Sequence, residues 1–369
     1  MDEQYISRLT KLVAQFSSQS FDAFIVSVPE NRYYLSGFSA EDGGPQETSG
    51  YLVISPDNRY LVTDGRYEIQ ARREAPLYEV IVYEESLLLT VAEILKNIRC
   101  GKVGFEGHYL TYTSYSRLVN ALKKVGYKCE IVATEDFVEN LRMIKDSSEI
   151  ELIEFSVGRT EDVLSRVAQE VKEGVSEREI ALLLEMELKK SGAEKVAFDP
   201  IVASGPNGAL PHAKPTKRSF ADGDAVVIDV GGKFNHYCSD MTRTLFVGSA
   251  TEEMVKVYKI VREAQKLAIS STMPGKTSKE IDSIARNYIA SRGYGDFFVH
   301  GLGHGVGLAV HEKPGINKRT DTKLAPGMVI TIEPGVYIKD LGGIRLEDMV
   351  LVTKDGCRVL NRDILYYEI

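Results

Sequence analysis

Residues 224–244 read DAVVIDVGGKFNHYCSDMTRT, and this stretch decides the fold. The apolar run 225–228 predicts a strand that ends on Asp229, and residues 241–247 predict a second strand that begins beside Asp240. The Gly-Gly pair at 231–232 predicts a β-hairpin with one carboxylate on each strand. Aspartates on paired strands repel each other unless a cation lies between them. The stretch alone leaves two interpretations open: a pair of solvated turn carboxylates, or half of a metal site.

The same pattern recurs near the end of the chain. Residues 223–231, GDAVVIDVG, align without gaps with residues 327–335, GMVITIEPG. In each copy an isoleucine precedes an acid, and a returning segment carries a second acid close to a methionine. The four acids are Asp229, Asp240, Glu333 and Glu347. We therefore predict two related halves that face each other with the acids between them, the alternative being chance similarity of two strand–turn–strand units.

The composition predicts a soluble cytoplasmic protein. The chain has 369 residues, 43% of them hydrophobic and 27% charged, as in a globular protein of about two domains. A net charge of -8 argues against a nucleic-acid partner and against an anionic membrane surface. No apolar run approaches the ~20 residues of a membrane span, and the acidic start MDEQY does not resemble a signal peptide. The four cysteines are scattered without a Cys-x-x-Cys pair, which favours a reducing compartment and argues against disulfides or a thiolate zinc site.

Hydrophobic periodicity divides the chain into two domains joined by a linker. We predict an α/β domain with a mixed sheet over residues 1–132, a linker over 133–147 and an α+β domain with antiparallel strands over 148–369. In the first domain the predicted helices are 3–18, 68–74, 87–98 and 113–125, and the predicted strands are 23–28, 51–54, 60–63, 102–105 and 128–132. In the second the predicted helices are 148–170, 176–191, 252–271 and 278–292, and the predicted strands are 224–230, 241–247, 328–332 and 344–352. Ser147 and Ser176 are the expected caps of the first two of these helices.

The four acids need positive charge if they share a buried site. Desolvation and mutual repulsion would otherwise protonate them, whereas two divalent cations would balance four carboxylates. Oxygen ligands suit Mn²⁺, Co²⁺, Fe²⁺ or Zn²⁺. His304, inside the run GLGHGVG at 301–307, is the expected imidazole ligand, although a lone histidine is more often structural. The glycine run lacks the spacing of a phosphate-binding loop.

The ordered set of four acids and His304 resembles the five-ligand signature of the pita-bread (M24-type) metallopeptidases. Neighbouring motifs narrow the resemblance to the Xaa-Pro branch, aminopeptidase P and prolidase. These motifs are Pro211-His212, HGLGH at 300–304, His311-Glu312, EPGVY at 333–337 and GIRLE at 343–347. NRYYLSGF at 31–38 and TDGRY at 63–67 resemble the creatinase/prolidase N-terminal domain more weakly. The resemblance implies an α/β N-terminal domain of that type followed by an α+β pita-bread catalytic domain.

The resemblance also implies a role for each ligand. Asp229 would bind one metal ion, and His304 and Glu333 would bind the other. Asp240 and Glu347 would bridge the two ions, with a water molecule between them as the nucleophile. Glu333 would act as the general base, unless it is a ligand only. Mn²⁺ or Co²⁺ is the expected metal, with Zn²⁺ or Fe²⁺ as alternatives.

Three further histidines and an arginine are expected around the metal ions. His311 would donate to the developing oxyanion, and His300 and His212 would shape the proline subsite, the alternative being histidines in solvated loops. Arg345 lies two residues before Glu347, so in a continuous strand both would point to one face. There Arg345 could hold Asp240 or Tyr337, or bind a substrate carboxylate.

The function that the resemblance implies is hydrolysis of the bond between an N-terminal residue and proline. The preferred interpretation is an Xaa-Pro aminopeptidase, and the alternative is an Xaa-Pro dipeptidase, or prolidase. A non-catalytic binding module of the same fold is a remote alternative, since such modules tend to lose ligands. The expected partners are a proline-containing peptide and a second copy of the chain in a homodimer.

Overall fold

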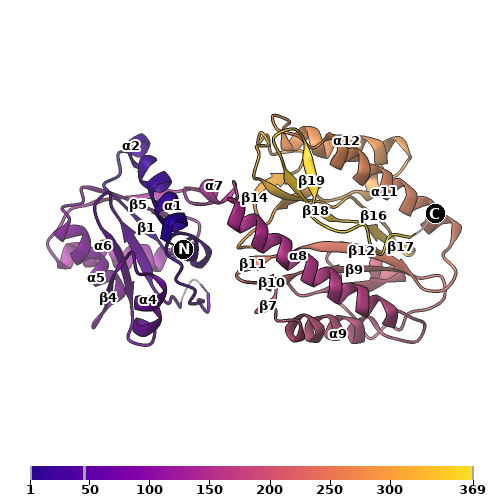
Figure 1. Cartoon of the computed structure of the whole chain (residues 1–369), viewed down its shortest axis with the longest axis horizontal. Coiled ribbons are helices and arrows are strands. Elements are labelled where there is room, and N and C mark those ends of the chain that lie inside the picture. Colours follow the sequence, from indigo (N-terminus) through magenta and orange to yellow (C-terminus); the bar gives the residue numbers. More distant parts are fainter. Residues whose placement is uncertain (1, 45–46, 368–369) are drawn as a thin grey trace. The chain divides into compact units, whose positions relative to one another are not determined.

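The computed structural model describes residues 2–44 and 47–367, and the chain forms two compact units, Met1–Arg142 and Met143–Ile369. The division falls inside the predicted linker 133–147. The fold class is as predicted, an α/β unit followed by an α+β unit (Figure 1). In the part of the chain that the structure describes, no helix combines the length and the apolar character needed to cross a bilayer.

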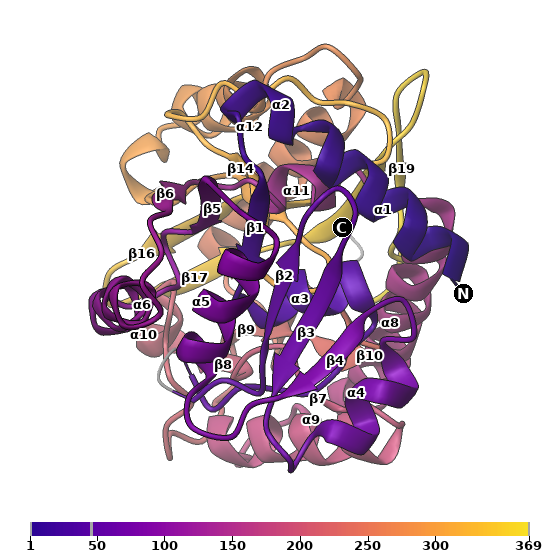
Figure 2. The ribbon, with the colours of Figure 1, turned by 90° about the vertical axis from the view of Figure 1, so that its left-hand side faces the viewer.

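The N-terminal unit is a six-stranded mixed sheet in the order β4-β3-β2-β1-β5-β6. Its strands are β1 (Ala23–Val26), β2 (Tyr51–Ile54), β3 (Arg59–Thr63), β4 (Glu79–Val82), β5 (Lys102–Glu106) and β6 (Glu130–Thr134). Its helices are α1 (Asp2–Ala14), α2 (Phe16–Gln19), α3 (Pro29–Ser36), α4 (Glu68–Glu74), α5 (Leu87–Asn97), α6 (Tyr112–Lys124) and α7 (Glu139–Arg142). Helices α5 and α6 cover one face of the sheet (Figure 2), and the stacked rings of Phe24 and Phe137 lie on the other.

Most of the predicted elements of this unit are present, and the hairpin of β2 and β3 pairs in the expected antiparallel register. Two elements were missed. Helix α3 has little amphipathic pattern because its buried face carries polar side chains, among them Asn31 and Arg32. Strand β4 is only four residues long and pairs in parallel with β3. Short elements of this kind give a weak periodic signal.

A buried carboxylate joins two elements of the N-terminal sheet. Glu106, at the end of β5, accepts hydrogen bonds from the Ser27 and Val28 amides at 2.5 and 2.6 Å. The Ser27 hydroxyl and the Asn31 side-chain amide donate to it at 2.9 and 2.7 Å. Burial raises the pKa of Glu106 to about 7, against the opposing effect of these hydrogen bonds.

We expect Glu106 to make the stability of the chain pH-dependent. Its pKa in the folded chain, about 7, lies above its ordinary value of 4.5, so the folded state binds more protons between these pH values. The contribution is therefore fully present below pH 4.5 and is lost as the pH rises through about 7. At about 1.4 kcal/mol per pKa unit the loss is about 3 kcal/mol. Other groups also titrate in this range, so the difference between urea unfolding at pH 5 and at pH 8 should be about 3 kcal/mol smaller in Glu106→Gln than in the wild type. An unchanged pH dependence in the variant would contradict the assignment.

The second unit contains two long helix pairs and several antiparallel sheets. Its helices are α8 (Ser147–Val167), α9 (Glu177–Lys190), α10 (Gly205–Gly208), α11 (Glu252–Ser271) and α12 (Ser278–Ser291), with 3-10 turns η1 (Ala168–Glu170) and η2 (Gly295–Phe297). The strands of its first half are β7 (Lys195–Val196), β8 (Ile201–Ser204), β9 (Ala225–Val230), β10 (Gly232–Phe234), β11 (Tyr237–Cys238) and β12 (Met241–Phe246). Those of its second half are β13 (Gly303–Gly305), β14 (Glu312–Ile316), β15 (Val329–Ile332), β16 (Gly335–Ile338), β17 (Gly342–Arg345), β18 (Asp348–Val352) and β19 (Cys357–Val359).

The two copies of the sequence repeat form equivalent antiparallel pairs. Strand β9 pairs with β12, and β15 pairs with β18. Helices α8 and α9 share a hydrophobic core with the first pair, and α11 and α12 share one with the second (Figure 1). Each half therefore buries its own apolar faces, and the acidic ends of the strands are left free to meet.

Three local predictions were wrong. The pair Gly231–Gly232 does not close the hairpin of β9 and β12; the chain continues through β10 and turns at Asn235–His236, both with positive φ. Helix α8 is capped by Asp146, with Glu149 completing a capping box, and not by Ser147. The predicted strand 344–352 is divided into β17 and β18, which have different partners.

Candidate metal centre

The five predicted metal ligands line a single cavity of about 890 Å³. Asp229 lies in β9, Asp240 immediately precedes β12 and His304 lies in β13. Glu333 directly follows β15, and Glu347 lies at the break between β17 and β18. One side-chain atom each from Asp240, His304 and Glu347 lie within 4.8 Å of one another. The fold thus brings acids from both halves of the unit to one place.

His304 is held as a neutral imidazole that faces the acids. Burial lowers its pKa to about 4. Its Nδ1 lies 3.1 Å from the Gly305 carbonyl oxygen, so this nitrogen carries the proton. Its Nε2 lies 3.5 Å from Asp240 Oδ2 and 3.4 Å from Glu333 Oε1. The available Nε2 lone pair is the form in which histidine binds metals. The glycine before His304 lets β13 lie close to β15, because a Cβ at Gly303 would lie 2.0 Å from the Thr331 carbonyl oxygen.

The carboxylates are too close to be ionised together without a cation. Burial raises the pKa of Asp240 and of Glu347 well above their ordinary values, and neighbouring carboxylates add to the effect. Burial also raises the pKa of Glu333 to about 8. The Oδ1 atom of Asp229 is buried and has no hydrogen-bond partner. An orphaned carboxylate oxygen beside three destabilised acids and a neutral imidazole fits divalent cations held by oxygen and nitrogen.

Arg345 connects the acids to the predicted accessory residues. Its guanidinium donates to Asp229 Oδ2 at 2.7 Å and to the Tyr337 hydroxyl at 2.8 Å. The Tyr337 hydroxyl also lies 2.9 Å from His300 Nε2. The contact with Tyr337 was predicted, but the carboxylate partner is Asp229 and not Asp240. The reason is that Arg345 ends β17, one residue before the break, so it does not share a continuous strand with Glu347.

The other two predicted histidines also line the cavity. The His311 ring lies 4.2 Å from the His304 ring, measured between centroids, and partial burial lowers the pKa of His311. His212 lies in the segment between β8 and β9 and is exposed. Burial, aided by the charge of Arg345, lowers the pKa of His300 to about 4. All three imidazoles therefore line the cavity that holds the acids, and His300 is fixed by its contact with Tyr337.

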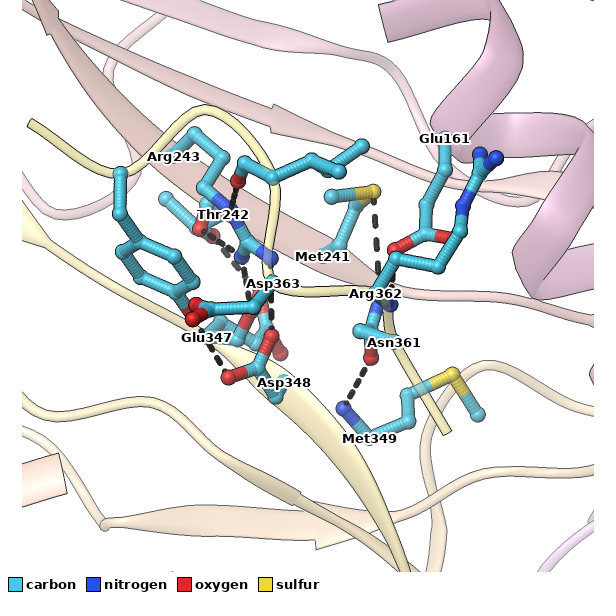
Figure 3. Close-up of polar contacts among 12 residues, drawn as sticks. Glu161, Met241, Thr242, Arg243, Glu347, Asp348, Met349, Asn361, Arg362 and Asp363 are labelled. Atoms are coloured by element: carbon cyan, nitrogen blue, oxygen red, sulfur yellow. Dashed lines mark hydrogen bonds and ion pairs between the residues drawn. The ribbon is translucent and has the colours of Figure 1, made fainter. Parts of the chain in front are cut away.

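A set of residues behind the metal ligands was not anticipated. The Thr242 hydroxyl donates to Glu347 Oε2 at 2.7 Å, on the cavity side of β12. On the reverse side, fully buried Arg243 donates to the Glu347 carbonyl at 2.6 Å and to Asp348 Oδ1 at 2.9 Å (Figure 3). The sequence could have indicated this arrangement, because successive side chains of a strand point to opposite faces, so Thr242 and Arg243 must lie on different sides of β12.

Exposed cations stand around the mouth of the cavity. Lys214 follows His212 in the segment before β9, and Lys318 and Arg319 follow β14. All three side chains are solvent-exposed and line the same cavity as the acids. The cavity therefore combines a buried acidic cluster with a rim that is basic on balance, since these three exposed cations outnumber the exposed acid Asp199.

Comparison with known proteins identifies both units. Residues 151–354 match the model of metallopeptidase family M24, and residues 8–144 match the creatinase/prolidase N-terminal domain. The chain is 43% identical over 358 residues to the Xaa-Pro dipeptidase of Pyrococcus furiosus, covering 96% of this chain and 97% of that protein.

Solved structures agree with this result. The structure of an Xaa-Pro dipeptidase from Bacillus anthracis has a TM-score of 0.92 at 36% identity, covering 97% of this chain and 98% of that one. An X-Pro aminopeptidase from Thermotoga maritima has a TM-score of 0.86 at 35% identity, with 96% and 97% covered. The chain belongs to metallopeptidase family M24, with a creatinase/prolidase-type N-terminal domain.

Proposed function

We propose that this chain is a metal-dependent Xaa-Pro dipeptidase, with Xaa-Pro aminopeptidase as the second candidate. The observation that carries the proposal is the meeting of four carboxylates and neutral His304 in one cavity. Two kinds of evidence favour the dipeptidase over the aminopeptidase that the sequence first suggested. Relatives at 43% and 40% identity are named Xaa-Pro dipeptidases, and the rim of the cavity is basic.

The proposed ligands are Asp229, Asp240, His304, Glu333 and Glu347. They would hold two divalent cations, with Mn²⁺ or Co²⁺ preferred and Zn²⁺ or Fe²⁺ as alternatives. When bound, such ions polarise the scissile carbonyl and make water a stronger nucleophile at neutral pH. Thr242 and Arg345 orient two of the carboxylates through the hydrogen bonds to Glu347 and Asp229.

The proposed chemistry gives the proton transfers to Glu333 and the stabilisation of the oxyanion to His311. Glu333 accepts a proton from the attacking water, and the same proton goes to the proline nitrogen as the peptide bond breaks. His311 donates a hydrogen bond to the carbonyl oxygen as negative charge develops there. His300, fixed by Tyr337, and His212 border the space for the proline ring. A peptide bond to proline has no N–H, so this site needs no acceptor for one.

The basic rim suits a substrate that ends at proline. The free carboxylate of a dipeptide lies one residue beyond the scissile bond, so it must be bound close to the metal centre. Lys214, Lys318 and Arg319 are exposed cations that line the same cavity and would bind that carboxylate, and guanidinium is the better partner for a planar carboxylate. A longer peptide would carry its carboxylate past the rim.

A set of four substrates tests the proposal. We expect Mn²⁺- or Co²⁺-loaded protein to hydrolyse Ala-Pro with kcat/KM at least about tenfold above Ala-Pro-Ala, equivalent to about 1.4 kcal/mol of carboxylate recognition. Ala-Pro amide, which lacks only the negative charge, is the matched control and should also be poor. Ala-Ala controls for the proline ring. Equal or faster hydrolysis of Ala-Pro-Ala would establish the aminopeptidase instead, and no hydrolysis of either would contradict both.

A cytoplasmic homodimer is also part of the proposal. The family resemblance supports the homodimer, and the lack of a Cys-x-x-Cys pair in the sequence favours a reducing compartment. Sedimentation of the purified, metal-loaded chain at several concentrations measures the oligomeric state directly.

A further inference from the structure

Five consecutive residues of one irregular segment line the cavity. They are Pro211, His212, Ala213, Lys214 and Pro215. The segment runs from the end of β8 to residue 216, and its only regular structure is the single turn α10. Because so short a helix has little stability of its own, the position of these residues must be fixed by contacts outside the segment.

A buried carboxylate, Glu177 in the first turn of α9, gathers both ends of this segment. Its side chain is fully buried and accepts five hydrogen bonds. Ser204 donates its amide and its hydroxyl to Oε1, both at 2.8 Å. Thr216 donates its amide and its hydroxyl to Oε2 at 2.9 and 2.6 Å. Asn207 donates its side-chain amide to Oε2 at 2.8 Å. One carboxylate therefore closes a loop of which residues 211–215 form the cavity wall.

Two further contacts transmit this arrangement to the cavity. The Asn207 side-chain amide also donates to the Lys214 carbonyl oxygen at 3.2 Å, so it links Glu177 to the wall itself. From the side of the metal centre, Arg345 donates to the Pro211 carbonyl oxygen at 3.0 Å. The wall is thus held between Glu177 at its base and Arg345, which also pairs with Asp229.

The second half of the unit has a related contact without a charge. Helix α12 begins at Ser278, the position that corresponds to Glu177 in α9. The Ser278 hydroxyl donates to the Thr320 carbonyl oxygen at 2.6 Å, beside Lys318 and Arg319 of the cavity rim. In both halves the first turn of a helix, α9 or α12, contacts a segment that lines the cavity. Of the two contacts, only that of Glu177 binds both ends of its segment.

We propose that Glu177 is a positioning residue that fixes the 205–216 segment and thereby sets the affinity of the site for its peptide. This inference rests on the proposed peptidase function. Glu177 does not line the cavity. Its loss should free the cavity wall, which contacts the substrate in the ground state, and leave the proposed ligands in place. The expected effect is therefore on KM more than on kcat.

Steady-state kinetics on Ala-Pro with three variants tests this. Glu177→Gln keeps the shape but offers one acceptor oxygen in place of two, and its amide group faces donors. It should raise KM about tenfold with kcat within about twofold and metal content unchanged. Asn207→Ala, a milder variant at a half-buried position, should raise KM in the same direction, and the double variant should not exceed Glu177→Gln alone. Glu179→Gln, an exposed acid on the same turn, is the matched control and should leave KM unchanged.

Hydrogen exchange separates failure of this inference from failure of the proposed function. In metal-free protein, Glu177→Gln and Asn207→Ala should accelerate amide exchange in residues 205–216 but not in residues 300–311, whatever the substrate. A wild type without activity on Xaa-Pro peptides would overturn the proposed function, and exchange would still decide the role of Glu177. Unchanged exchange in both variants, or unchanged KM in an active enzyme, would overturn the inference. If Glu177→Gln does not fold, Asn207→Ala carries both measurements.

Discussion

Asp240→Ala is expected to abolish peptidase activity and to remove most of the stabilisation that metal confers. Asp240 lies 3.5 Å from His304 Nε2 and belongs to the same cluster as Glu347, and it is the proposed bridging ligand, so its loss leaves neither proposed metal position complete. Metal at about 100 times its Kd should stabilise the wild type by about 2.7 kcal/mol, and the variant by much less. Thermal unfolding with and without Mn²⁺, together with metal analysis, measures both effects.

Without metal, loss of the Asp240 charge should not destabilise the protein. Asp240→Asn removes one of several mutually repelling buried carboxylates and keeps the volume, so the metal-free variant should be at least as stable as the wild type. Asp199→Asn is the matched control, since Asp199 lines the same cavity but is exposed and lies outside the proposed ligand set. It should keep its metal content. An Asp240→Ala protein with near-normal turnover would show that the proposed ligand set is wrong.

Arg243→Met should cause the largest loss of stability, about 3–5 kcal/mol, because it removes the nearer cation from buried Asp348 and leaves only Arg262, 3.9 Å away. The guanidinium is fully buried, donates to Asp348 Oδ1 at 2.9 Å and also holds the carbonyl oxygens of Glu347 and Ile364 at 2.6 and 2.9 Å. Urea unfolding of the metal-free protein gives the change. Arg358→Ala, which breaks an exposed ion pair with Glu154, is the control and should cost about 0–1 kcal/mol.

A double variant distinguishes loss of the pair from loss of a single partner. Combining Arg243→Met with Asp348→Leu replaces both charges by apolar groups, so much of the stability should return. The recovery will be partial, because Gln265 and Tyr366 also donate to Asp348, at 3.1 and 2.6 Å. If Arg243→Met costs no more than Arg358→Ala, the ion pair on the reverse side of the metal strands does not stabilise the unit.

The metal-site candidates could be predicted from the sequence because each acid follows or precedes a strongly apolar strand. The repeat of residues 223–231 at 327–335 gave the pairing of β9 with β12 and of β15 with β18. The extra hairpin of β10 and β11 was not predictable from periodicity. Its turn at Asn235–His236 requires two residues with positive φ, and the Gly-Gly pair beside it is the stronger turn signal.

Residues whose partners lie far away along the chain were the least predictable. Glu177 has the sequence signature of an ordinary acid in the first turn of a helix, and its partners lie 27 to 39 positions away. Arg345 was placed in the site, but its partner depended on a break in the strand at residues 346–347 that no local pattern indicates. Local patterns therefore predicted the candidate metal ligands and accessory residues. Only the tertiary structure shows which other residues form hydrogen bonds that fix their positions.

The positions of the proposed ligands along the chain have a consequence for biosynthesis. They span residues 229 to 347, with two in the first half of the unit and three in the second. A nascent chain can complete the N-terminal sheet early, because all six of its strands lie before residue 135. The metal centre cannot assemble until β18 has left the ribosome. Until then Asp229 and Asp240 have no partners from the other half, so the ions should enter only after both halves of the second unit have been synthesised.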